Sequence, residues 1–337
     1  MGKQLRFGLV LFAAAGAVYF YLNYRFESHY ENGRLGYVKI VARGAGAAGS
    51  DQASALPAAE TFRPTFRIAT FNLGRFDEAK AANRSVNDVL VHLLPQFELT
   101  ALQGIRGKNQ GVLVRLVEQI NAASGRAFDF ATCPTQKRDA IEHYTAFLFD
   151  RQRIEVDRTT VHFVEDPLHR FRVKPLVGEF RARGPNPAEA FTFTLINVET
   201  DPEHVAAELD LLAEVYRTVR DRYARAADGK MEDDIILLGD LESDDAHLGP
   251  LNHLWGVSPL LSGLPSTVRG TQLLDNILLD RRATREFTGR VEVVDLQHDF
   301  ELTMADAMEV SEHLPVWAEF SVYEGGQPGQ VLLQTPK

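Results

Sequence analysis

The chain has 337 residues, of which 45% are hydrophobic, so it is long enough to bury a sizeable core as one large domain or two ordinary ones. Its formal net charge of −10 excludes a protein that binds nucleic acid through a broad basic surface, because such binding rests on clustered Lys and Arg. Cys133 is the only cysteine, which excludes an intramolecular disulfide and leaves the fold to its core and any bound metal.

An uncharged apolar run at 7–24 follows Lys3 and Arg6. It has the length at which a helix just spans a bilayer, and its tyrosine-rich end is typical of the membrane interface. We therefore expect a basic flank at 1–6 and a single-pass transmembrane signal anchor at 7–24, with the rest of the chain outside the cytoplasm. A signal peptide that is cleaved to give a secreted protein, and a soluble N-terminal helix, are the alternatives.

Residues 42–61 are mostly Ala, Gly and Ser without an apolar period, and they predict a flexible linker. A folded domain is expected over 62–323. The tail at 324–337 is rich in Gly, Pro and Gln and is expected to be flexible.

Short β-rich runs alternate with helical patterns along this domain. One helix is predicted to be capped by Ser85 and stopped by Pro95, a second to run from Gly111 to Gly125, and a third from Asp201 as N-cap to Gly229. This alternation indicates an α/β fold with a mixed sheet or two packed sheets. The runs that predict strands lie at 66–73, 97–104, 144–150, 191–199, 234–242, 273–280 and 314–323.

Polar residues gather at the ends of these runs, where α/β folds place functional groups. Most offer oxygen ligands suited to Mg²⁺, Mn²⁺ or Ca²⁺, and His313 is the one group among them that titrates near neutral pH. Taken singly, each could equally form a turn, cap a helix or lie exposed. The residues are Asn72, Gln103, Gly104, Glu199, Asp240, Glu242, Asp275, Asn276, Glu312 and His313.

The order of several short motifs resembles the endonuclease/exonuclease/phosphatase superfamily, and its DNase I-like branch in particular. The motifs span about 260 residues and are TFN at 70–72, ALQ at 101–103, YTAFLFD at 144–150, LLGD at 237–240, LLDNILL at 273–279 and SEHLPV at 311–316. The resemblance implies a four-layer α/β sandwich, in which two packed mixed sheets are flanked by helices, with a divalent-metal site along one edge.

Four residues match the family's catalytic pattern. The resemblance implies that Asn72 and His313 bind phosphate, that Asp240 positions water, and that Asp275 supports the histidine. Together they would form the catalytic set.

Four other positions depart from that pattern. Gly104 stands where the family has a glutamate, its principal metal ligand, and Glu199 stands where it has a histidine. Glu242 replaces an asparagine and Glu312 an aspartate. The site thus loses its strongest metal anchor and gains two negative charges where a phosphodiester would lie, which predicts weakened hydrolysis.

The preferred interpretation is a membrane-anchored pseudoenzyme that has lost most or all hydrolysis and binds an unidentified protein partner, because Gly104 and Glu199 affect different steps of the reaction. In that case no metal is required. A purely structural envelope protein is a further class.

The alternative is a metal-dependent phosphodiesterase, nuclease or phosphatase that acts on a phosphate ester or nucleic acid. Asp240, Glu242 and Glu312, with Glu199, would then hold a displaced Mg²⁺, Mn²⁺ or Ca²⁺ ion. A basic strip that contains Arg170 and Arg172 and continues into 174–184 would lie near such a substrate.

Overall fold

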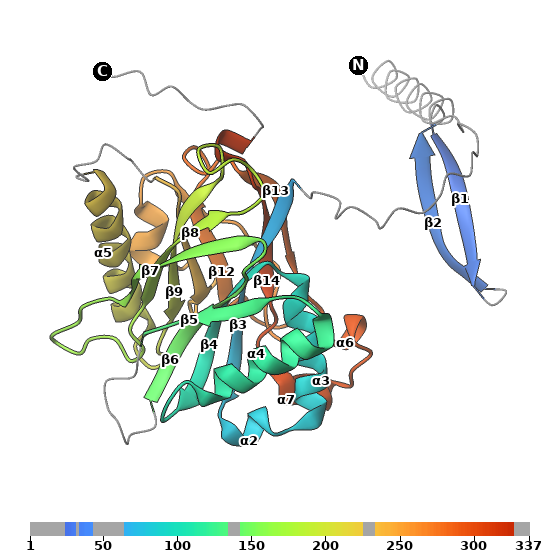
Figure 1. Cartoon of the computed structure of the whole chain (residues 1–337), viewed down its shortest axis with the longest axis horizontal. Coiled ribbons are helices and arrows are strands. Elements are labelled where there is room, and N and C mark those ends of the chain that lie inside the picture. Colours follow the sequence, from blue (N-terminus) through green and yellow to red (C-terminus); the bar gives the residue numbers. More distant parts are fainter. Residues whose placement is uncertain (1–23, 32–33, 43–63, 134–141, 225–232, 327–337) are drawn as a thin grey trace, which may run out of the picture. The chain divides into compact units, whose positions relative to one another are not determined.

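The computed structural model describes residues 24–31, 34–42, 64–133, 142–224 and 233–326 (Figure 1). The chain divides into two compact units, Met1–Thr61 and Phe62–Lys337. In the first unit, β1 (Tyr24–Glu31) and β2 (Arg34–Ala42) pair as antiparallel strands.

The predicted anchor and linker lie outside the described residues, except that Tyr24 begins β1 and Ala42 ends β2. Within the described part of the chain, no helix is both long and apolar enough to cross a membrane.

Two six-stranded sheets form the centre of the second unit. The first has the strand order β13 (Phe287–Val293), β14 (Val316–Ser321), β3 (Thr65–Phe76), β4 (Leu99–Gly107), β6 (Glu142–Asp150) and β5 (Phe128–Ala131). The second has the order β11 (Val257–Pro259), β12 (Asp275–Asp280), β10 (Ile235–Asp240), β9 (Thr192–Glu199), β8 (Leu176–Ala182) and β7 (Ile154–Phe163). Both sheets are mixed, because the pairs β3–β4 and β9–β10 are parallel while the other neighbours are antiparallel.

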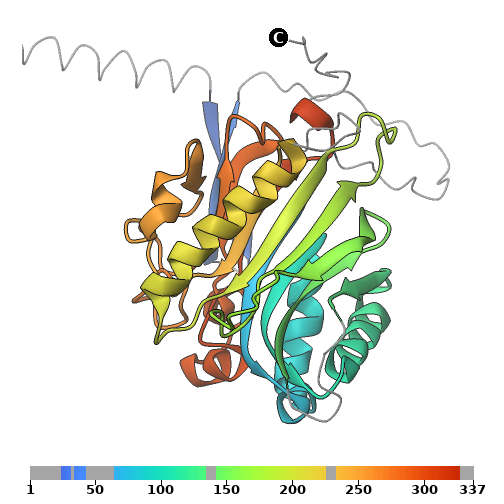
Figure 2. The same ribbon diagram turned by 90° about the vertical axis from the view of Figure 1, so that its left-hand side faces the viewer.

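Helices cover the outer face of each sheet. The first sheet carries α2 (Glu78–Ala81), α3 (Arg84–Leu93), η1 (Leu94–Gln96), α4 (Gly111–Ser124), α6 (Leu296–Asp299) and α7 (Met304–Val310) on its side, and the second carries α5 (Val205–Ala224) and η2 (Gly249–His253). In Figure 2, α5, in yellow, lies over the strands of its sheet.

Three apolar clusters hold these layers together. One lies between the first sheet and its helices, one between the two sheets, and one between the second sheet and α5. The middle cluster is rich in phenylalanine, and Phe66, Phe191 and Phe193 stack within it. The predicted four-layer α/β sandwich is therefore confirmed.

Each predicted strand forms, but two predicted helix starts were wrong. Asn83, not Ser85, caps α3, since its Oδ1 accepts hydrogen bonds from the backbone N–H of Ser85 at 3.0 Å and of Val86 at 3.4 Å. Asp201 does not cap α5, which begins at Val205. The Asp201 side chain instead pairs with His204 and Arg172.

The predicted end of the third helix and the predicted tail are only partly covered by the described residues. The expected end of the third helix at Gly229 lies outside the described residues, as do 327–337 of the expected tail. The first three residues of that tail form η3 (Glu324–Gly326), which hydrogen-bonds to the body of the domain.

Candidate active site

The carboxyl ends of β9 and β10, the start of β12, the part of β3 around Asn72 and the loop before β14 meet at one edge of the sandwich. In the second sheet, Asp240 at the end of β10 lies in register with Glu199 of β9 on one side and with Asp275 of β12 on the other. Asn72 of β3 reaches across from the first sheet, and its Nδ2 donates to Asp240 Oδ2 at 2.7 Å. Residues far apart in the sequence thus form one connected polar group.

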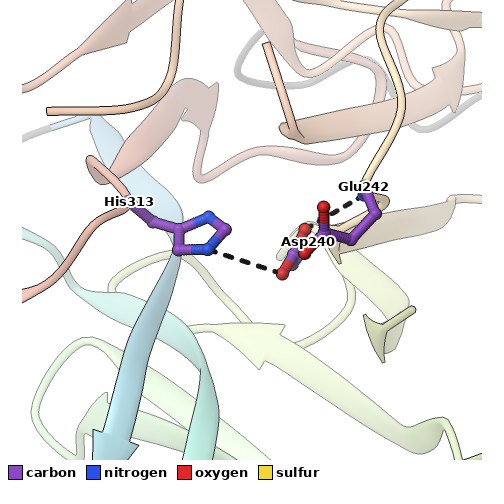
Figure 3. Close-up of side chains that lie close together, drawn as sticks. All are labelled: Asp240, Glu242 and His313. Atoms are coloured by element: carbon purple, nitrogen blue, oxygen red, sulfur yellow. Dashed lines mark hydrogen bonds and ion pairs between the residues drawn. The ribbon is translucent and has the colours of Figure 1, made fainter. Parts of the chain in front are cut away.

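His313 is held by a buried aspartate. Its Nδ1 donates to Asp275 Oδ2 at 2.9 Å, and the same oxygen accepts a hydrogen bond from Ser266 Oγ at 2.8 Å. The ring is 8% exposed and Asp275 is fully buried. Because Nδ1 is engaged, Nε2 faces Asp240 Oδ2 at 3.7 Å (Figure 3).

The charges around His313 decide its protonation. Burial alone lowers the pKa of its imidazole, but the charge of Asp275, the hydrogen bond to that residue and the charges of Asp240 and Glu242 outweigh burial and raise the pKa to about 10. At neutral pH the ring is therefore an imidazolium that can donate from Nε2.

Asn72 and His313 are also joined through Ser311. Ser311 Oγ donates to the backbone carbonyl of Asn72 at 2.6 Å and accepts from the backbone N–H of His313 at 3.0 Å. The N–H of Gly74 donates to Asn72 Oδ1 at 2.8 Å, which turns the amide nitrogen toward Asp240. These contacts fix both side chains before any substrate binds.

Asp240, Glu242 and His313 form a group whose ligand atoms all lie within 4.8 Å of one another (Figure 3). The backbone N–H of Glu242 donates to Asp240 Oδ1 at 3.0 Å. Burial, reinforced by the charge of Asp275, raises the pKa of Asp240. Glu312, which the sequence placed in the metal set, is exposed and does not join this group, so His313 takes its place beside the two acids.

The backbone at Gly104 leaves no room for a side chain. Its φ of +75° is left-handed, and a Cβ there would lie 2.1 Å from the carbonyl oxygen of Gly74 and 2.7 Å from Asn72 Oδ1. The pairing of β4 with β6 shifts register between Leu102 and Ile105, so Gly104 lies in a bulge of the kind found beside active sites.

A carboxylate is nevertheless present at this position. The N–H of Gly104 donates to Glu199 Oε2 at 2.9 Å. The acid missing from residue 104 is thus supplied across the sheet interface by residue 199.

An imidazole is present there as well. His143 of β6 places Nε2 2.7 Å from Glu199 Oε1, an ion-pair distance without the alignment of a hydrogen bond. His143 was not predicted as a site residue, although it directly precedes the YTAFLFD motif, because only the β4–β6 pairing brings it to this edge.

Two basic side chains lie at the rim. Lys80 Nζ donates to the carbonyl of Leu73 at 2.7 Å, and burial lowers the pKa of this lysine to about 8 against the opposing charges of Asp77 and Glu312. Arg172 Nη1 donates to Asp201 Oδ1 at 2.9 Å, and that contact, with the charge of Glu199 among others, raises the pKa of the guanidinium.

The other residues of the predicted basic strip make contacts elsewhere. Arg170 faces Asp166 at 3.9 Å, and residues 176–182 form β8, which is mostly buried inside its sheet rather than solvated.

Gln103 and Asn276 have structural roles. Gln103 is fully buried, and its Nε2 donates to Asn197 Oδ1 at 2.8 Å, which joins the two sheets. Asn276 exchanges hydrogen bonds with the backbone of Leu261.

Comparisons with known proteins agree with this geometry. No model of a known protein family matches the chain. Deoxyribonuclease-1-like 1 of Sus scrofa is 28% identical over 271 residues, which cover 76% of this chain and 81% of that protein. Deoxyribonuclease-1-like 2 of Homo sapiens is 26% identical over 292 residues, which cover 78% and 93%.

Among solved structures, D. rerio TDP2 humanised by 14 mutations matches with a TM-score of 0.50 at 13% identity, covering 77% of this chain and all of that one. That likeness concerns the fold. The motif order and the two relatives show that the chain is similar to the DNase I-like proteins of the endonuclease/exonuclease/phosphatase superfamily.

Proposed function

We propose that this chain is a divalent-metal-dependent phosphodiester hydrolase in which side chains from neighbouring strands replace two of the family's groups. The observation that carries the proposal is the contact between Gly104 N–H and Glu199 Oε2, with His143 on the other oxygen of the same carboxylate. The two departures that suggested loss of activity therefore touch each other, and a carboxylate and an imidazole both remain at this edge.

The residues present fit a divalent cation. Asp240 and Asp275 are buried, and Glu242 and Glu199 lie beside them. Asp275 Oδ1 is buried and accepts no hydrogen bond from the part of the chain that the structure describes. Such an excess of carboxylate oxygen over positive charge favours a hard cation. Asp240, Glu242 and Glu199 would hold Mg²⁺, Mn²⁺ or Ca²⁺, and the ion would supply charge neutralisation at the phosphate.

The other groups have roles that follow from their contacts. His313, protonated and held by Asp275, can donate from Nε2 to a phosphate oxygen. Asp240, oriented by Asn72 and by the N–H of Glu242, presents a carboxylate that can align the attacking water and accept its proton. Ser311 keeps Asn72 and His313 at a fixed separation, which a reaction in a preorganised site requires.

DNA is the first substrate to test, because the relatives are named deoxyribonucleases. Arg172 and Lys80 at the rim offer positive charge to a phosphate backbone that approaches an otherwise acidic domain.

The proposed location is outside the cytoplasm, with the domain held to a membrane by the apolar run at 7–24. Protease treatment of intact cells should digest the domain and leave a membrane-bound N-terminal fragment. A full-length protein that stays protected inside cells would contradict this topology.

The test of activity uses the full chain with plasmid DNA and bis-(p-nitrophenyl) phosphate, in chelator and with each of Mg²⁺, Mn²⁺ and Ca²⁺. We expect metal-dependent cleavage that Glu199→Gln and His313→Asn each reduce at least tenfold. Glu312→Gln, which changes an exposed acid of the same loop, is the matched control and should retain activity.

Absence of cleavage in every metal would instead favour the pseudoenzyme with a protein partner. Restoring the family's glutamate by Gly104→Glu is not a usable control, since its Cβ would collide with Gly74.

A further inference from the structure

A second group of carboxylates lies at the opposite end of the sandwich from the active site. Asp234 immediately precedes β10, Glu286 immediately precedes β13, and Glu324 begins η3. One oxygen of each lies within 4.8 Å of the others. Asp240 ends the same β10, so the two groups are separated by the length of that strand, about 20 Å.

Glu286 is the centre of this group. Its side chain is 1% exposed, and Asp234 is 2% exposed. The N–H of Gly325 donates to Glu286 Oε1, but Oε2 is buried and accepts no hydrogen bond from any described residue. The N–H of Thr192 donates to Glu324 Oε2 at 3.3 Å.

The two glutamates of this group lack a basic partner among the described residues. Within the described ranges, neither Glu286 nor Glu324 forms an ion pair with Lys, Arg or His. Burial first, and then the charges of Glu324 and Asp233, raise the pKa of Glu286 to about 7. Buried carboxylates without a counter-charge are unfavourable unless a cation or a proton is bound.

We propose that Asp234, Glu286 and Glu324 bind one Ca²⁺ ion that stabilises this end of the domain. Ca²⁺ takes six to eight oxygens at about 2.3–2.6 Å, so two of its ligands can be at most about 5 Å apart, as these oxygens are. Three carboxylates can offer up to six oxygens, and Ca²⁺ tolerates the irregular geometry that Mg²⁺ does not.

The bound ion would join three segments that are distant in the sequence. It links the start of β10 in the second sheet to the start of β13 in the first and to the turn that follows β14. The backbone already brings these segments together, because the N–H of Ser321 donates to the carbonyl of Glu286, and a Cβ at Gly326 would lie only 2.8 Å from the carbonyl oxygen of Arg285. The site is therefore preformed rather than assembled by the ion.

The experiment must separate this ion from one at the active site. The full chain with Asp240→Asn and Glu242→Gln is titrated with CaCl₂ by calorimetry, and its Tm is measured in chelator and in 2 mM Ca²⁺. We expect one bound Ca²⁺ per chain and a Tm several degrees higher in Ca²⁺.

Adding Glu286→Gln to this background should abolish both effects, while Glu292→Gln, an exposed acid on β13, should leave them unchanged. Because Glu286→Gln removes a buried charge at constant shape, its Tm in chelator should be at least that of the parent, which shows that the lost response is not unfolding.

Two results would overturn the proposal. One is the absence of stoichiometric Ca²⁺ binding in the Asp240→Asn/Glu242→Gln chain. The other is Ca²⁺ binding and a Tm increase that persist with Glu286→Gln and with Glu324→Gln. Neither result depends on phosphodiester cleavage, so the test is independent of the catalytic proposal.

Discussion

Strand β10 carries a buried carboxylate at each end, and the two ends are surrounded very differently. At its carboxyl end, Asp240 meets the imidazole of His313 and the amide of Asn72. At its amino end, Asp234 lies beside two further carboxylates, those of Glu286 and Glu324.

The difference separates two uses of acidic side chains. An imidazole and an amide lie beside the acids where β9 and β10 end in parallel, whereas the group near η3 consists of carboxylates. An arrangement with rings and amides can move protons and orient a substrate, whereas an all-carboxylate arrangement can only hold a cation or a proton. Under the two proposals, the same strand serves catalysis at one end and stability at the other.

The largest effect should come from the active end. His313→Asn removes the proton donor and should lower phosphodiester cleavage by about 10²–10⁴-fold, the usual contribution of general acid–base catalysis. Glu286→Gln should change the same rate less than twofold. Initial rates with saturating metal measure both, and equal losses in the two variants would erase the distinction between the ends.

Next in size is the glycine at the bulge. Gly104→Ala should destabilise the domain by about 2–4 kcal/mol, because it combines a left-handed backbone with a collision against Gly74. Gly125→Ala is the matched change, since its φ of +68° is similar but its Cβ would meet nothing within 4 Å; it should cost only about 1 kcal/mol. Urea unfolding in chelator compares the two variants. Similar losses in the free energy of unfolding would mean that the backbone around Gly104 can relax.

Lys80 should make the stability of the folded domain depend on pH. Its folded pKa of about 8 lies below the unfolded value of 10.5, so the folded state holds the proton less tightly. Stability is then reduced below pH 8 and recovers as the pH rises from about 8 to 10.5. Lys80→Met should flatten this rise by about 1–2 kcal/mol, discounted for partial exposure. Identical urea midpoints against pH for the two proteins would contradict the shift.

The smallest effect concerns Glu242, which adopts a left-handed φ of +48°. Glu242→Asn should stabilise the metal-free domain by about 1 kcal/mol, because asparagine tolerates this conformation better and the change also removes a charge that faces Asp240. Glu301→Asn, at an exposed residue with φ +53°, isolates the backbone part and should give about half as much. A destabilised Glu242→Asn domain in chelator would show that the acid already has a counter-charge.

Much of the fold could be predicted because its strands are continuous apolar runs. β4 and β10 are buried on both faces, so their sequences carry a clear signal. β7 and β13 were missed because most of their residues are partly or fully exposed, and they belong to the sheets only through pairing with β8 and β14.

The site also has a part that the sequence predicts and a part that it does not. Asn72, Asp240, Asp275 and His313 were identified from motif order, and the structure brings all four together. What the sequence could not show was contact between strands: Glu199 lies against the backbone of Gly104, and His143 lies against Glu199, yet 95 positions separate the first pair. Gly104 and Glu199 look like independent departures in the sequence, but they are neighbours in the fold.

The position of the carbonyl oxygen of Gly74 limits which substitutions the site can accept. It occupies the space that a side chain at residue 104 would need, so a single substitution back to glutamate meets backbone rather than an empty position. Reversal would require the segment after Asn72 to move first, and Asn72 is itself tied to Asp240 and Ser311. A side chain at residue 104 is therefore compatible with this edge only after the backbone around Gly74 has changed, whereas Glu199 can be altered without that movement.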